Sequence, residues 1–344
     1  MRILLISGGS GGHLFPLVAV LREIEKQLPD AVTCFVCSDK PEDRTMLKHE
    51  EIDMHTLPLV RSPWKHPLSL IRNWKAARTL LDTFQPDVVF SKGGGISVPL
   101  CFEARRRKIP IVLHESDAVM GRANRTVAAW ASRVCLGFPA ARLPSTWSVT
   151  GNPIRPQITE GKREEGLRIA GLAGKKPVLL VLGGSQGAVA LNDAMRTCLE
   201  ELLQTVDVIH VTGEGKAGAE KRPGYFSLPF AREEFPHLYA ASTLALSRAG
   251  AGTIGELAAC GIPVMLVPLE GLAQDHQTTN AKAVAASNGA MILLQKDLRE
   301  RLPDTVKALV NDTHRLQEMR EGMRKIAHTD SAEQITKVIR ETIA

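Results

Sequence analysis

The sequence has no long hydrophobic run and few aromatic residues. Its longest apolar stretches, residues 178–182 and 262–269, are far shorter than the roughly 20 residues that a membrane-spanning helix needs. The apolar start of the chain gives way to serine and glycine after residue 6, and it is too short for the core of a signal peptide, about 7–15 residues. We therefore expect a cytosolic protein whose chain does not cross a bilayer.

Disulfide and metal signatures are missing too. The six cysteines do not have the spacing of a secreted disulfide framework. Cys34 and Cys37 form a C-x-x-C, but a three-residue step within an apolar strand places the two side chains on opposite faces of that strand. No second Cys or His pair follows at zinc spacing. We interpret most of the cysteines as reduced core residues and expect no metal site.

The common nucleotide-binding fingerprints are also absent. The G-x-G-x-x-G pattern fails because Leu14 stands where its last glycine would be, and G-x-x-x-x-G-K-[ST] does not occur. The sequence has no D-x-D, the motif that would indicate a metal bridging a diphosphate to carboxylates. These absences disfavour dinucleotide dehydrogenases and P-loop NTPases.

What the sequence does contain is an alternation of strand and helix patterns that occurs twice. Such alternation is typical of a parallel sheet covered by helices on both faces. The 28 glycines and 20 prolines fit its tight turns, and 344 residues predict about two domains. The pattern restarts after residue 153, and we expect residues 152–174, which are rich in Pro and Gly, to contain the linker.

The expected elements fall into two sets, which predict an α/β protein with two doubly wound domains, residues 1–155 and 156–329. Residues 304–344 are helical in composition, with a break at 328–330 and a helix start at Ser331. Periodicity does not reveal which domain this last helix, residues 330–344, joins. Strands are expected at 2–7, 31–37, 87–90, 111–113, 178–182, 206–211, 244–247 and 263–267, and helices at 15–27, 68–84, 97–107, 124–131, 191–203, 253–260 and 277–287.

Four glycine-rich turns stand where a strand gives way to a helix: residues 8–12, 92–95, 183–187 and 248–253. A glycine turn that leads into a helix directs backbone N–H groups and the positive end of the helix dipole at an anion. One such turn alone is equally consistent with a tight structural turn. Two turns per domain favour a diphosphate ligand in a cleft between the domains, with Arg155 or Arg248 helping to neutralise it.

Polar side chains near these turns are candidates for recognition of the ligand. Glu256 falls one turn into an expected helix, where its carboxylate can accept hydrogen bonds from a ribose diol. The alternative is that it only complements the helix dipole. Asp275, His276, Gln277 and Asn280 suit sugar hydroxyls, although capping of a helix by Asp275 would explain part of this cluster.

Two imidazoles are candidates for acid–base work. His13 stands between the first glycine turn and a helix, where a neutral imidazole could remove a proton from an attacking hydroxyl. A helix-terminal histidine without that role is the alternative. His114 and Glu115 add a second imidazole and a carboxylate at the same edge of the sheet, so the identity of the base stays open.

Basic charge is concentrated in the first half of the chain. Residues 1–155 have 21 basic and 14 acidic side chains, a net +7, whereas residues 156–344 have 22 and 23, a net −1. Residues 61–78 contain five Lys or Arg and no acid, interleaved with tryptophans, which suits an anionic lipid surface. A core-facing amphipathic helix with a solvated basic side is the alternative, and without a nucleic-acid motif we expect no nucleic-acid partner. The predicted membrane patch comprises Trp64, Lys65, Leu68, Ile71, Arg72, Trp74 and Lys75.

These motifs, taken in order, resemble the MurG family of GlcNAc transferases, which complete the lipid-linked precursor of bacterial peptidoglycan. The likeness covers nearly the whole chain. It rests on S-G-G-S-G-G-H-L-F-P at residues 7–16, the pair His114 and Glu115, G-x-x-N-R at 121–125, G-N-P-I-R at 151–155, G-G-S-Q-G-A at 183–188, S-R-A-G-A at 247–251, E-L-A-A at 256–259, D-H-Q at 275–277 and N-A at 280–281.

The resemblance implies a GT-B fold, in which two Rossmann-like domains face a cleft. The second domain would hold most of UDP-GlcNAc, the first would receive a lipid-linked MurNAc-pentapeptide, and the terminal helix would return to the first domain. The resemblance further implies inverting transfer by direct displacement, with no metal and no cofactor. It also implies a role in cell wall biogenesis, and so in cell shape and cell division, at the cytoplasmic face of the plasma (inner) membrane.

The resemblance also assigns residues to the donor site. Glu256 would bind the ribose diol, Arg155 and Ser185 would contact the diphosphate, Gln277 would bind the GlcNAc hydroxyls, and His13 resembles the proposed base. Together with Arg248 and the catalytic candidate Glu115, the predicted catalytic and UDP-GlcNAc-binding set is His13, Glu115, Ser10, Gly11, Gly12, Asp117, Arg155, Ser185, Arg248, Ala251, Gly252, Thr253, Ile254, Gly255, Glu256 and Gln277, and the predicted acceptor diphosphate loop is Gly93, Gly94 and Gly95.

Two positions depart from the family pattern. Gly95 stands where an aromatic residue usually follows the glycine loop, and Asp117 stands where an amide would touch the donor sugar. We expect GlcNAc transfer from UDP-GlcNAc to the muramyl-pentapeptide pyrophosphoryl lipid. The alternatives are a related GT-B enzyme for another lipid acceptor, a UDP-GlcNAc 2-epimerase, and a membrane-associated sugar-nucleotide sensor without turnover.

Overall fold

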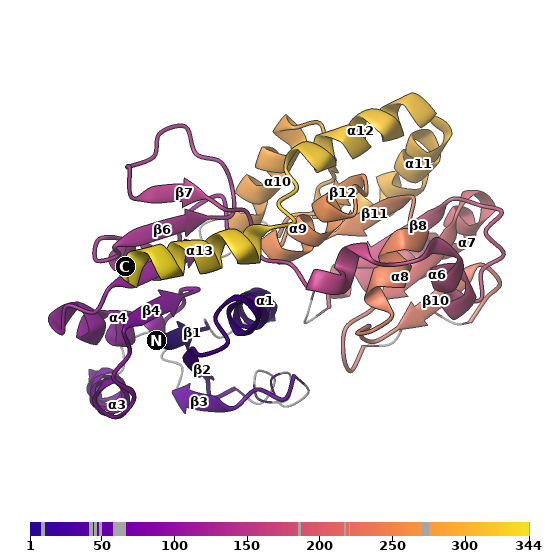
Figure 1. The fold of residues 1–344 in the computed structure, drawn as a ribbon. Helices are drawn as coiled ribbons and strands as arrows, with labels where there is room; N and C mark the ends of the chain where they lie inside the picture. Colours follow the sequence, from indigo (N-terminus) through magenta and orange to yellow (C-terminus); the bar gives the residue numbers. More distant parts are fainter. Residues whose placement is uncertain are drawn as a thin grey trace. The chain divides into compact units, whose positions relative to one another are not determined.

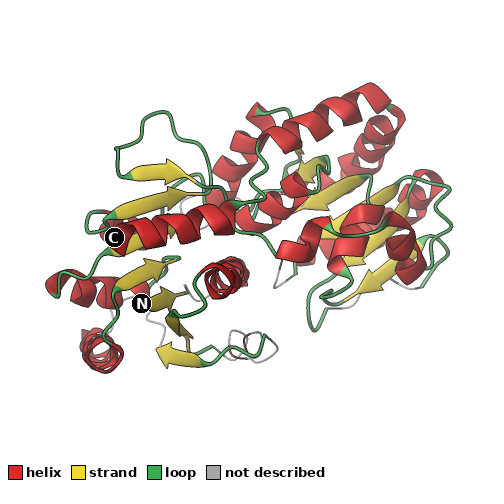
Figure 2. Ribbon diagram, viewed as in Figure 1, coloured by secondary structure: helices red, strands yellow, loops and turns green. Residues whose placement is uncertain are grey.

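The computed structural model describes residues 1–7, 11–40, 44, 47, 50–57, 67–184, 187–216, 218–219, 221–269 and 275–343, with the side chains of 11–13 and 67–71 left out. The chain divides into two compact units. Unit 1 comprises Met1–Ile154 and Thr329–Ala344, and unit 2 comprises Arg155–His328. Both units are parallel-sheet α/β domains of the Rossmann type, so the predicted fold class is confirmed (Figures 1 and 2).

Unit 1 is built on a sheet whose seven described strands run parallel in the order β3-β2-β1-β4-β5-β6-β7. Strands not predicted from the sequence are β3, β6 and β7. The elements are β1 (Arg2–Ile6), α1 (Gly11–Gln27), β2 (Val32–Ser38), β3 (Met54–Leu57), α3 (Pro67–Phe84), β4 (Val88–Ser91), α4 (Ser97–Arg106), β5 (Ile111–Glu115), α5 (Arg122–Ala128), β6 (Arg133–Leu136), β7 (Trp147–Val149) and, after unit 2, α13 (Ser331–Ile343).

The two faces of this sheet carry separate cores, because successive side chains of a strand point to opposite faces. Ile3 and Leu5 pack into the core that α1 and α13 cover, whereas Leu4 and Ile6 pack into the core that α3, α4 and α5 cover (Figure 1). Burial on both faces explains why the strands are almost wholly apolar. Cys37 belongs to the first core and Cys34 to the second, which confirms that the C-x-x-C places its side chains apart.

Unit 2 repeats the plan with six described parallel strands in the order β10-β9-β8-β11-β12-β13. Its main core joins one face of the sheet to α7, α11 and α12. Strands β10 and β13 were not predicted. The elements are a 3-10 turn (Pro156–Thr159), α6 (Arg163–Ala170), β8 (Val178–Leu182), α7 (Val189–Thr205), β9 (Asp207–Val211), β10 (Tyr225–Leu228), α8 (Phe235–Ala241), β11 (Leu244–Ser247), α9 (Ala251–Ala259), β12 (Val264–Leu266), α10 (His276–Ala286), β13 (Ala290–Ile292), a 3-10 turn (Gln295–Asp297), α11 (Leu298–Asn311) and α12 (Thr313–Lys325).

Residues 152–174 are not the open linker that their Pro and Gly content suggested. The unit boundary follows Ile154, and the remainder contains the 3-10 turn at Pro156–Thr159 and helix α6 of unit 2. Gly166 of α6 lies so close to α8 that a Cβ there would overlap the backbone of His237, and Arg163 donates a 2.7 Å hydrogen bond to the Ala241 carbonyl. Small residues allowed two helices to approach closely, which composition alone did not reveal.

The C-terminal helix belongs to unit 1. Helix α13 begins at Ser331, as the sequence predicted, and buries Ile335 and Ile339 in the core shared with α1 (Figure 1). Its first residue is tied to the end of the N-terminal part of the unit, because the Ser331 hydroxyl donates to the Gly151 carbonyl at 2.9 Å. Among the described residues, no helix is both long enough and apolar enough to span a bilayer.

Candidate functional site

In both sheets the strand order reverses next to the first strand of the unit, and such switch points are where open α/β sheets bind ligands. In unit 2 the reversal lies between β8 and β11, so the loops after these strands flank it. In unit 1 it lies between β1 and β4. The glycine-rich turns at residues 92–95 and 248–253 therefore follow strands that flank a switch point, β4 in unit 1 and β11 in unit 2.

The loop after β8 is shaped by glycines in the left-handed region. Gly184 has φ +80° and Gly187 has φ +65°, and a Cβ on Gly187 would overlap the Thr212 carbonyl. The Lys216 ammonium donates to the Gly187 carbonyl at 3.0 Å, which fastens this loop to the one after β9. Ser185, predicted to contact the diphosphate, lies outside the described residues.

The loop after β11 leads directly into helix α9. Gly250 precedes the helix, and the positions where Gly250 and Gly252 would carry a Cβ are open space. The first N–H groups of a helix have no partner within it, so the predicted stretch of residues 251–256 offers backbone donors. Asn280 of α10 stabilises the loop, because its side-chain amide donates to the Ala249 carbonyl at 3.1 Å.

Arg155 and Glu256 were predicted to bind different parts of the ligand, and the structure brings them together. Arg155 Nε lies 2.7 Å from Glu256 Oε1, and Arg155 Nη2 lies 2.9 Å from Oε2, a bidentate ion pair. The Tyr239 hydroxyl donates to Oε2 at 3.0 Å, and the Arg155 guanidinium stacks 4.3 Å from the centre of the Phe235 ring. Burial, and then the adjacent carboxylate, raise the pKa of Tyr239 well above its usual value. The tyrosine therefore stays a donor to Glu256.

Sequence reasoning missed Phe235 and Tyr239. Both lie on α8, Tyr239 is 1% exposed, and it precedes by 17 residues the glutamate that it contacts. An aromatic residue in an apolar helix gives no signal beyond core packing. The contact became visible only when the structure placed α8 beside α9.

Arg248 and Gln277, two further candidates of unit 2, hydrogen-bond to neighbouring residues. Arg248 donates to the Val267 carbonyl at 3.1 Å and to Gln295 Oε1 at 2.5 Å, and burial lowers its pKa. Gln277 lies in the first turn of α10, and its side-chain oxygen accepts from Leu269 N at 3.1 Å. Asp275 stands at the helix start with φ +56° and makes no side-chain cap, so capping does not explain its presence there.

In unit 1 the predicted acceptor diphosphate loop follows β4 directly. Gly93 and Gly94 have φ +89° and +84°, a conformation that favours glycine. A Cβ on Gly93 would overlap the amide of Asn124, so α5 packs tightly against this loop. Gly95, where the family has an aromatic residue, precedes the helix start of α4. The glycines are required by backbone conformation as well as by any ligand.

Glu115, a predicted catalytic residue, holds the segment that follows β5. Its Oε1 accepts from Asp117 N at 2.9 Å, and its Oε2 accepts from Gly121 N at 3.2 Å and Asn124 Nδ2 at 2.8 Å. Burial raises the pKa of Glu115, and these hydrogen bonds act in the opposite direction. Asn124 was part of a quoted motif without an assigned role. The structure brings it together with Glu115 and Gly93, while a catalytic role of Glu115 stays a prediction.

In the sequence, Lys92 is recognisable only as the first residue of a glycine-rich turn. The structure buries it, at 1% exposure, with its ammonium 2.7 Å from His114 Nδ1 and 2.8 Å from Ser116 Oγ. The available signal was a lysine directly after a strand that is buried along its whole length. A lysine side chain at this position begins in the interior of the unit and has little access to solvent.

The first glycine turn lies largely beyond what the structure describes. Ser10 is outside the described residues, and the side chain of His13 is outside them as well. The backbone of Gly11, Gly12 and His13 forms the first turn of α1, which begins earlier than the predicted residue 15 and contains Pro16. The roles predicted for these residues remain predictions.

The predicted membrane patch is described only in part. Trp64 and Lys65 lie outside the described residues, and so do the side chains of Leu68 and Ile71. Arg72, Trp74 and Lys75 are exposed on α3, while Asn73, Ala77 and Leu81 form its buried side. Trp74, 43% exposed, lies edge-on to Phe102 of α4 with ring centres 5.2 Å apart.

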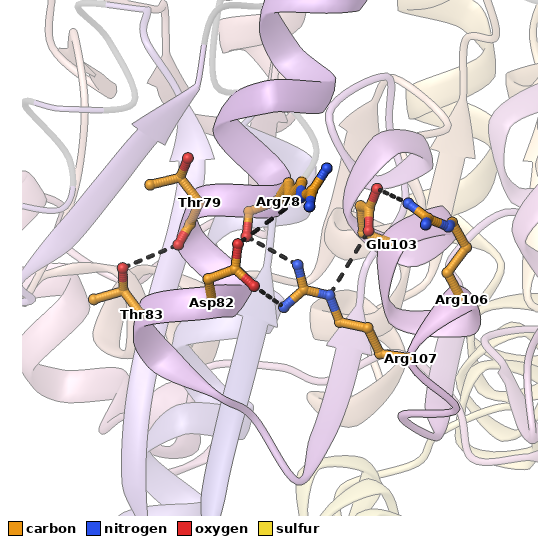
Figure 3. Close-up of polar contacts among 7 residues, drawn as sticks. All are labelled: Arg78, Thr79, Asp82, Thr83, Glu103, Arg106 and Arg107. Atoms are coloured by element: carbon orange, nitrogen blue, oxygen red, sulfur yellow. Dashed lines mark hydrogen bonds and ion pairs between the residues drawn. The ribbon is translucent and has the colours of Figure 1, made fainter.

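The other end of α3 is fastened to α4 by ion pairs. Arg107 lies 3.0 Å from Asp82 and 3.7 Å from Glu103, and it donates to the Arg78 carbonyl at 3.1 Å (Figure 3). Glu103 also pairs with Arg106 at 3.0 Å. Arg107, which follows α4, thus connects that helix to the one that carries the exposed Trp74.

Two family models match the chain. The glycosyltransferase family 28 N-terminal domain matches residues 3–136, and the glycosyltransferase family 28 C-terminal domain matches residues 178–335. The first match includes most of the unit 1 sheet but not β7, and the second includes the whole described sheet of unit 2.

Relatives of known activity match over almost the full length. A protein of Clostridium kluyveri is 33% identical over 91% of this chain and 92% of its own length. One of Lachnoclostridium phytofermentans is 33% identical over 99% of this chain and 98% of its own. Both are named UDP-N-acetylglucosamine–N-acetylmuramyl-(pentapeptide) pyrophosphoryl-undecaprenol N-acetylglucosamine transferase.

Solved structures are also similar to this chain over nearly its full length. MurG of Acinetobacter baumannii superposes with a TM-score of 0.77 at 25% identity, covering 99% of both chains. A UDP-GlcNAc 2-epimerase of Neisseria meningitidis has a TM-score of 0.69 at 13% identity, covering 99% of this chain and 100% of its own, a likeness that concerns the fold alone.

Proposed function

The chain belongs to the MurG family within glycosyltransferase family 28, and on this premise we propose that it transfers GlcNAc from UDP-GlcNAc to a lipid-linked MurNAc-pentapeptide with inversion at the anomeric carbon. The observation that carries the proposal is the Glu256 cluster in unit 2. A carboxylate fixed by Arg155 and Tyr239 beside the open N-terminal turn of α9 suits a nucleoside diphosphate.

Glu256 has acceptor capacity for the donor while its ion pair persists. An ionised carboxylate has about four lone-pair sites, and three hydrogen bonds reach Glu256 here. A ribose hydroxyl can therefore donate to Oε1, and Arg155, which stacks on the Phe235 ring, would place the positive charge of its guanidinium near the diphosphate. The open positions at Gly250 and Gly252 would let phosphate oxygens approach the backbone N–H groups.

The acceptor is assigned to unit 1. The acceptor hydroxyl would attack the anomeric carbon from the face opposite UDP and give its proton to His13, the residue that the family pattern favours as base. The new C–O bond forms as the bond to the UDP oxygen breaks, and UDP leaves with the bonding electrons. Backbone N–H groups and Arg155 stabilise the charge that develops on the leaving diphosphate.

We further propose peripheral binding at the cytoplasmic face of the plasma membrane through α3. Exposed Arg72, Trp74 and Lys75 combine two basic side chains with an indole, a combination that suits the interface of an anionic bilayer. The net +7 of residues 1–155 adds a longer-range attraction.

One assay separates this function from its alternatives. Purified protein is incubated with labelled UDP-GlcNAc and the undecaprenyl-pyrophosphoryl MurNAc-pentapeptide, and a labelled lipid is the expected product. Epimer formation from the donor alone would identify an epimerase, and donor binding without turnover of any lipid would identify a sensor. Turnover only with a different glycolipid would change the acceptor while retaining the reaction type.

A further inference from the structure

Lys92 is a charged side chain in the interior of unit 1 that the reaction above does not use. It is 1% exposed and follows the last residue of β4, so it lies at the base of the predicted acceptor diphosphate loop. Burying an ammonium is costly unless hydrogen bonds and opposite charges compensate. Such an arrangement calls for a reason beyond packing, because an apolar side chain would fill the same space at less cost.

The ammonium joins the ends of two strands. Its 2.7 Å contact with His114 Nδ1 and 2.8 Å contact with Ser116 Oγ connect β4 to the end of β5 and the residues after it. His114 Nε2 lies 2.9 Å from the Gly151 carbonyl, which also accepts from Ser331. A neutral imidazole with its proton on Nε2 satisfies both contacts. The hydrogen bonds thus run from the loop to the two points where the chain leaves and re-enters unit 1.

The surroundings of Lys92 bring its pKa close to neutral. Burial lowers the pKa of Lys92 to about 7, and the carboxylates of Glu115 and Asp117 and the Cys135 thiol oppose that effect. Together with His114, these are the titratable groups that face it from β5, from the segment after β5, and from β6. An added negative charge near the loop would shift this balance toward the protonated form.

We propose that Lys92 is a positioning residue for the acceptor: it holds the end of β5 through His114 and Ser116, and its buried positive charge favours binding of an anionic diphosphate at the loop of Gly93, Gly94 and Gly95. The inference rests on the proposed function and adds a mechanism to it. Since the diphosphate favours the protonated lysine, linkage requires that protonation of the lysine favours the diphosphate equally. Binding of the acceptor therefore weakens as the pH rises past the value at which the lysine loses its proton.

The test is the pH dependence of the acceptor KM, measured with labelled UDP-GlcNAc and the undecaprenyl-pyrophosphoryl MurNAc-pentapeptide from roughly pH 6 to about pH 9. A diphosphate diester has no group that titrates in this range. If the acceptor raises the pKa of Lys92 by one unit, its KM rises about tenfold across the range. The donor KM, which reports on unit 2, is expected to stay within about twofold.

Lys92→Met retains most of the side-chain volume and removes the charge. It is expected to show an acceptor KM that is already high at low pH and no longer changes with pH, with the donor KM unaltered. Lys176→Met is the matched control, because it also exchanges a lysine for methionine but in unit 2. The Lys176 ammonium donates to the Leu203 carbonyl, outside the contacts of the acceptor loop. The control is expected to keep the wild-type profile.

If circular dichroism shows that Lys92→Met is not folded, Ser116→Ala provides the test instead. It removes one acceptor of the ammonium with little change in volume, so the rise in acceptor KM moves to lower pH. An unchanged profile in both variants would overturn the role of Lys92 while leaving the transferase activity intact. Absence of any labelled lipid with the wild-type protein would instead refute the proposed function, and this inference with it.

Discussion

The two units share a fold but place their ionised side chains differently. In unit 2 the paired side chains of Arg155 and Glu256 keep 23% and 13% of their surface exposed, beside the open turn of α9. In unit 1 the corresponding turn has its charges beneath it: Lys92 is 1% exposed and Glu115 is 5% exposed. Unit 2 presents charge for direct contact with a ligand, whereas unit 1 uses charge to shape a loop and to set the electrostatic field around it.

The two arrangements are expected to respond differently to ligand binding and to substitution. The partly exposed pair of unit 2 can bind a ligand group while the pair itself persists, because the carboxylate keeps acceptor capacity. A buried network loses stability when one member is removed, because the remaining groups are left unsatisfied. Substitutions in unit 2 should therefore change binding more than stability, and substitutions in unit 1 should change both.

The largest effect is expected for Glu256→Ala. The variant loses the proposed hydrogen bond to the ribose and leaves Arg155 and the Tyr239 hydroxyl without their shared acceptor. We expect kcat/KM for UDP-GlcNAc to fall by about 100-fold or more, corresponding to about 3 kcal/mol. Initial rates at varied donor concentration measure this loss.

Glu256→Gln is the matched control, because the amide keeps the shape and one oxygen while losing the charge. Its loss should be clearly smaller than that of the alanine variant. If Glu256→Ala turned over the donor within about twofold of the wild-type rate, the assignment of this cluster to the donor would be wrong.

The second test concerns a buried histidine of unit 2. His210 lies 2.9 Å from the Tyr225 hydroxyl and 3.0 Å from Asn192 Oδ1, and burial lowers its pKa to about 4. Because the unfolded chain binds a proton at about pH 6.5 and the folded one does not, stability falls as the pH drops from about 6.5 to about 4. The loss is on the order of 3 kcal/mol at most.

His210→Gln removes the titration and retains a polar side chain. Thermal unfolding of the variant should depend less on pH between about 4 and 6.5 than that of the wild-type protein. For Lys92 in unit 1, the lowered pKa acts in the same direction at higher pH: stability rises between about pH 7 and about pH 10 as the unfolded-state lysine gives up its proton. Equal pH profiles for wild type and His210→Gln would contradict the first assignment.

Much of this fold was readable from the sequence, and the failures have physical causes. Central strands such as β1 and β8 are apolar, apart from Arg2 at the start of β1, because both faces are buried, and they were predicted. Edge strands β3 and β7 are short and partly exposed, so their sequences lack that signal. Periodicity identified helix α13 but did not assign it to unit 1, because that packing depends on a chain that returns from unit 2.

The site shows the same limit. Glycine turns and Glu256 were found because turn chemistry is local in sequence. The partnership of Glu256 with Arg155 spans 101 residues, and that of Lys92 with His114 spans 22, so neither follows from local pattern. The resemblance to a family supplied roles for single residues but not the contacts between them.

Two glycines compare the units directly. Gly93→Ala forces a side chain into a left-handed conformation and against Asn124, so it should destabilise the protein by about 1–3 kcal/mol. Gly252→Ala adds its methyl group to open space in a helix and should leave stability equal or higher by about 0.5–1 kcal/mol. Yet it should weaken donor binding, since the methyl group lies where phosphate oxygens would approach. Chemical denaturation and donor KM measure the two effects, and a stable Gly93→Ala protein would contradict the first.

The smallest effect concerns the membrane. Lys75→Ala removes one exposed cation of α3, and Lys307→Ala removes an equally exposed cation of α11 in unit 2. If α3 faces an anionic surface, Lys75→Ala should weaken binding to vesicles rich in phosphatidylglycerol by about fivefold, about 1 kcal/mol, and Lys307→Ala should not. Raising the salt concentration should erase the difference, because screening removes the attraction of single exposed charges. Equal losses for both lysines would mean that net charge alone attracts the protein, and the specific role of α3 would be lost.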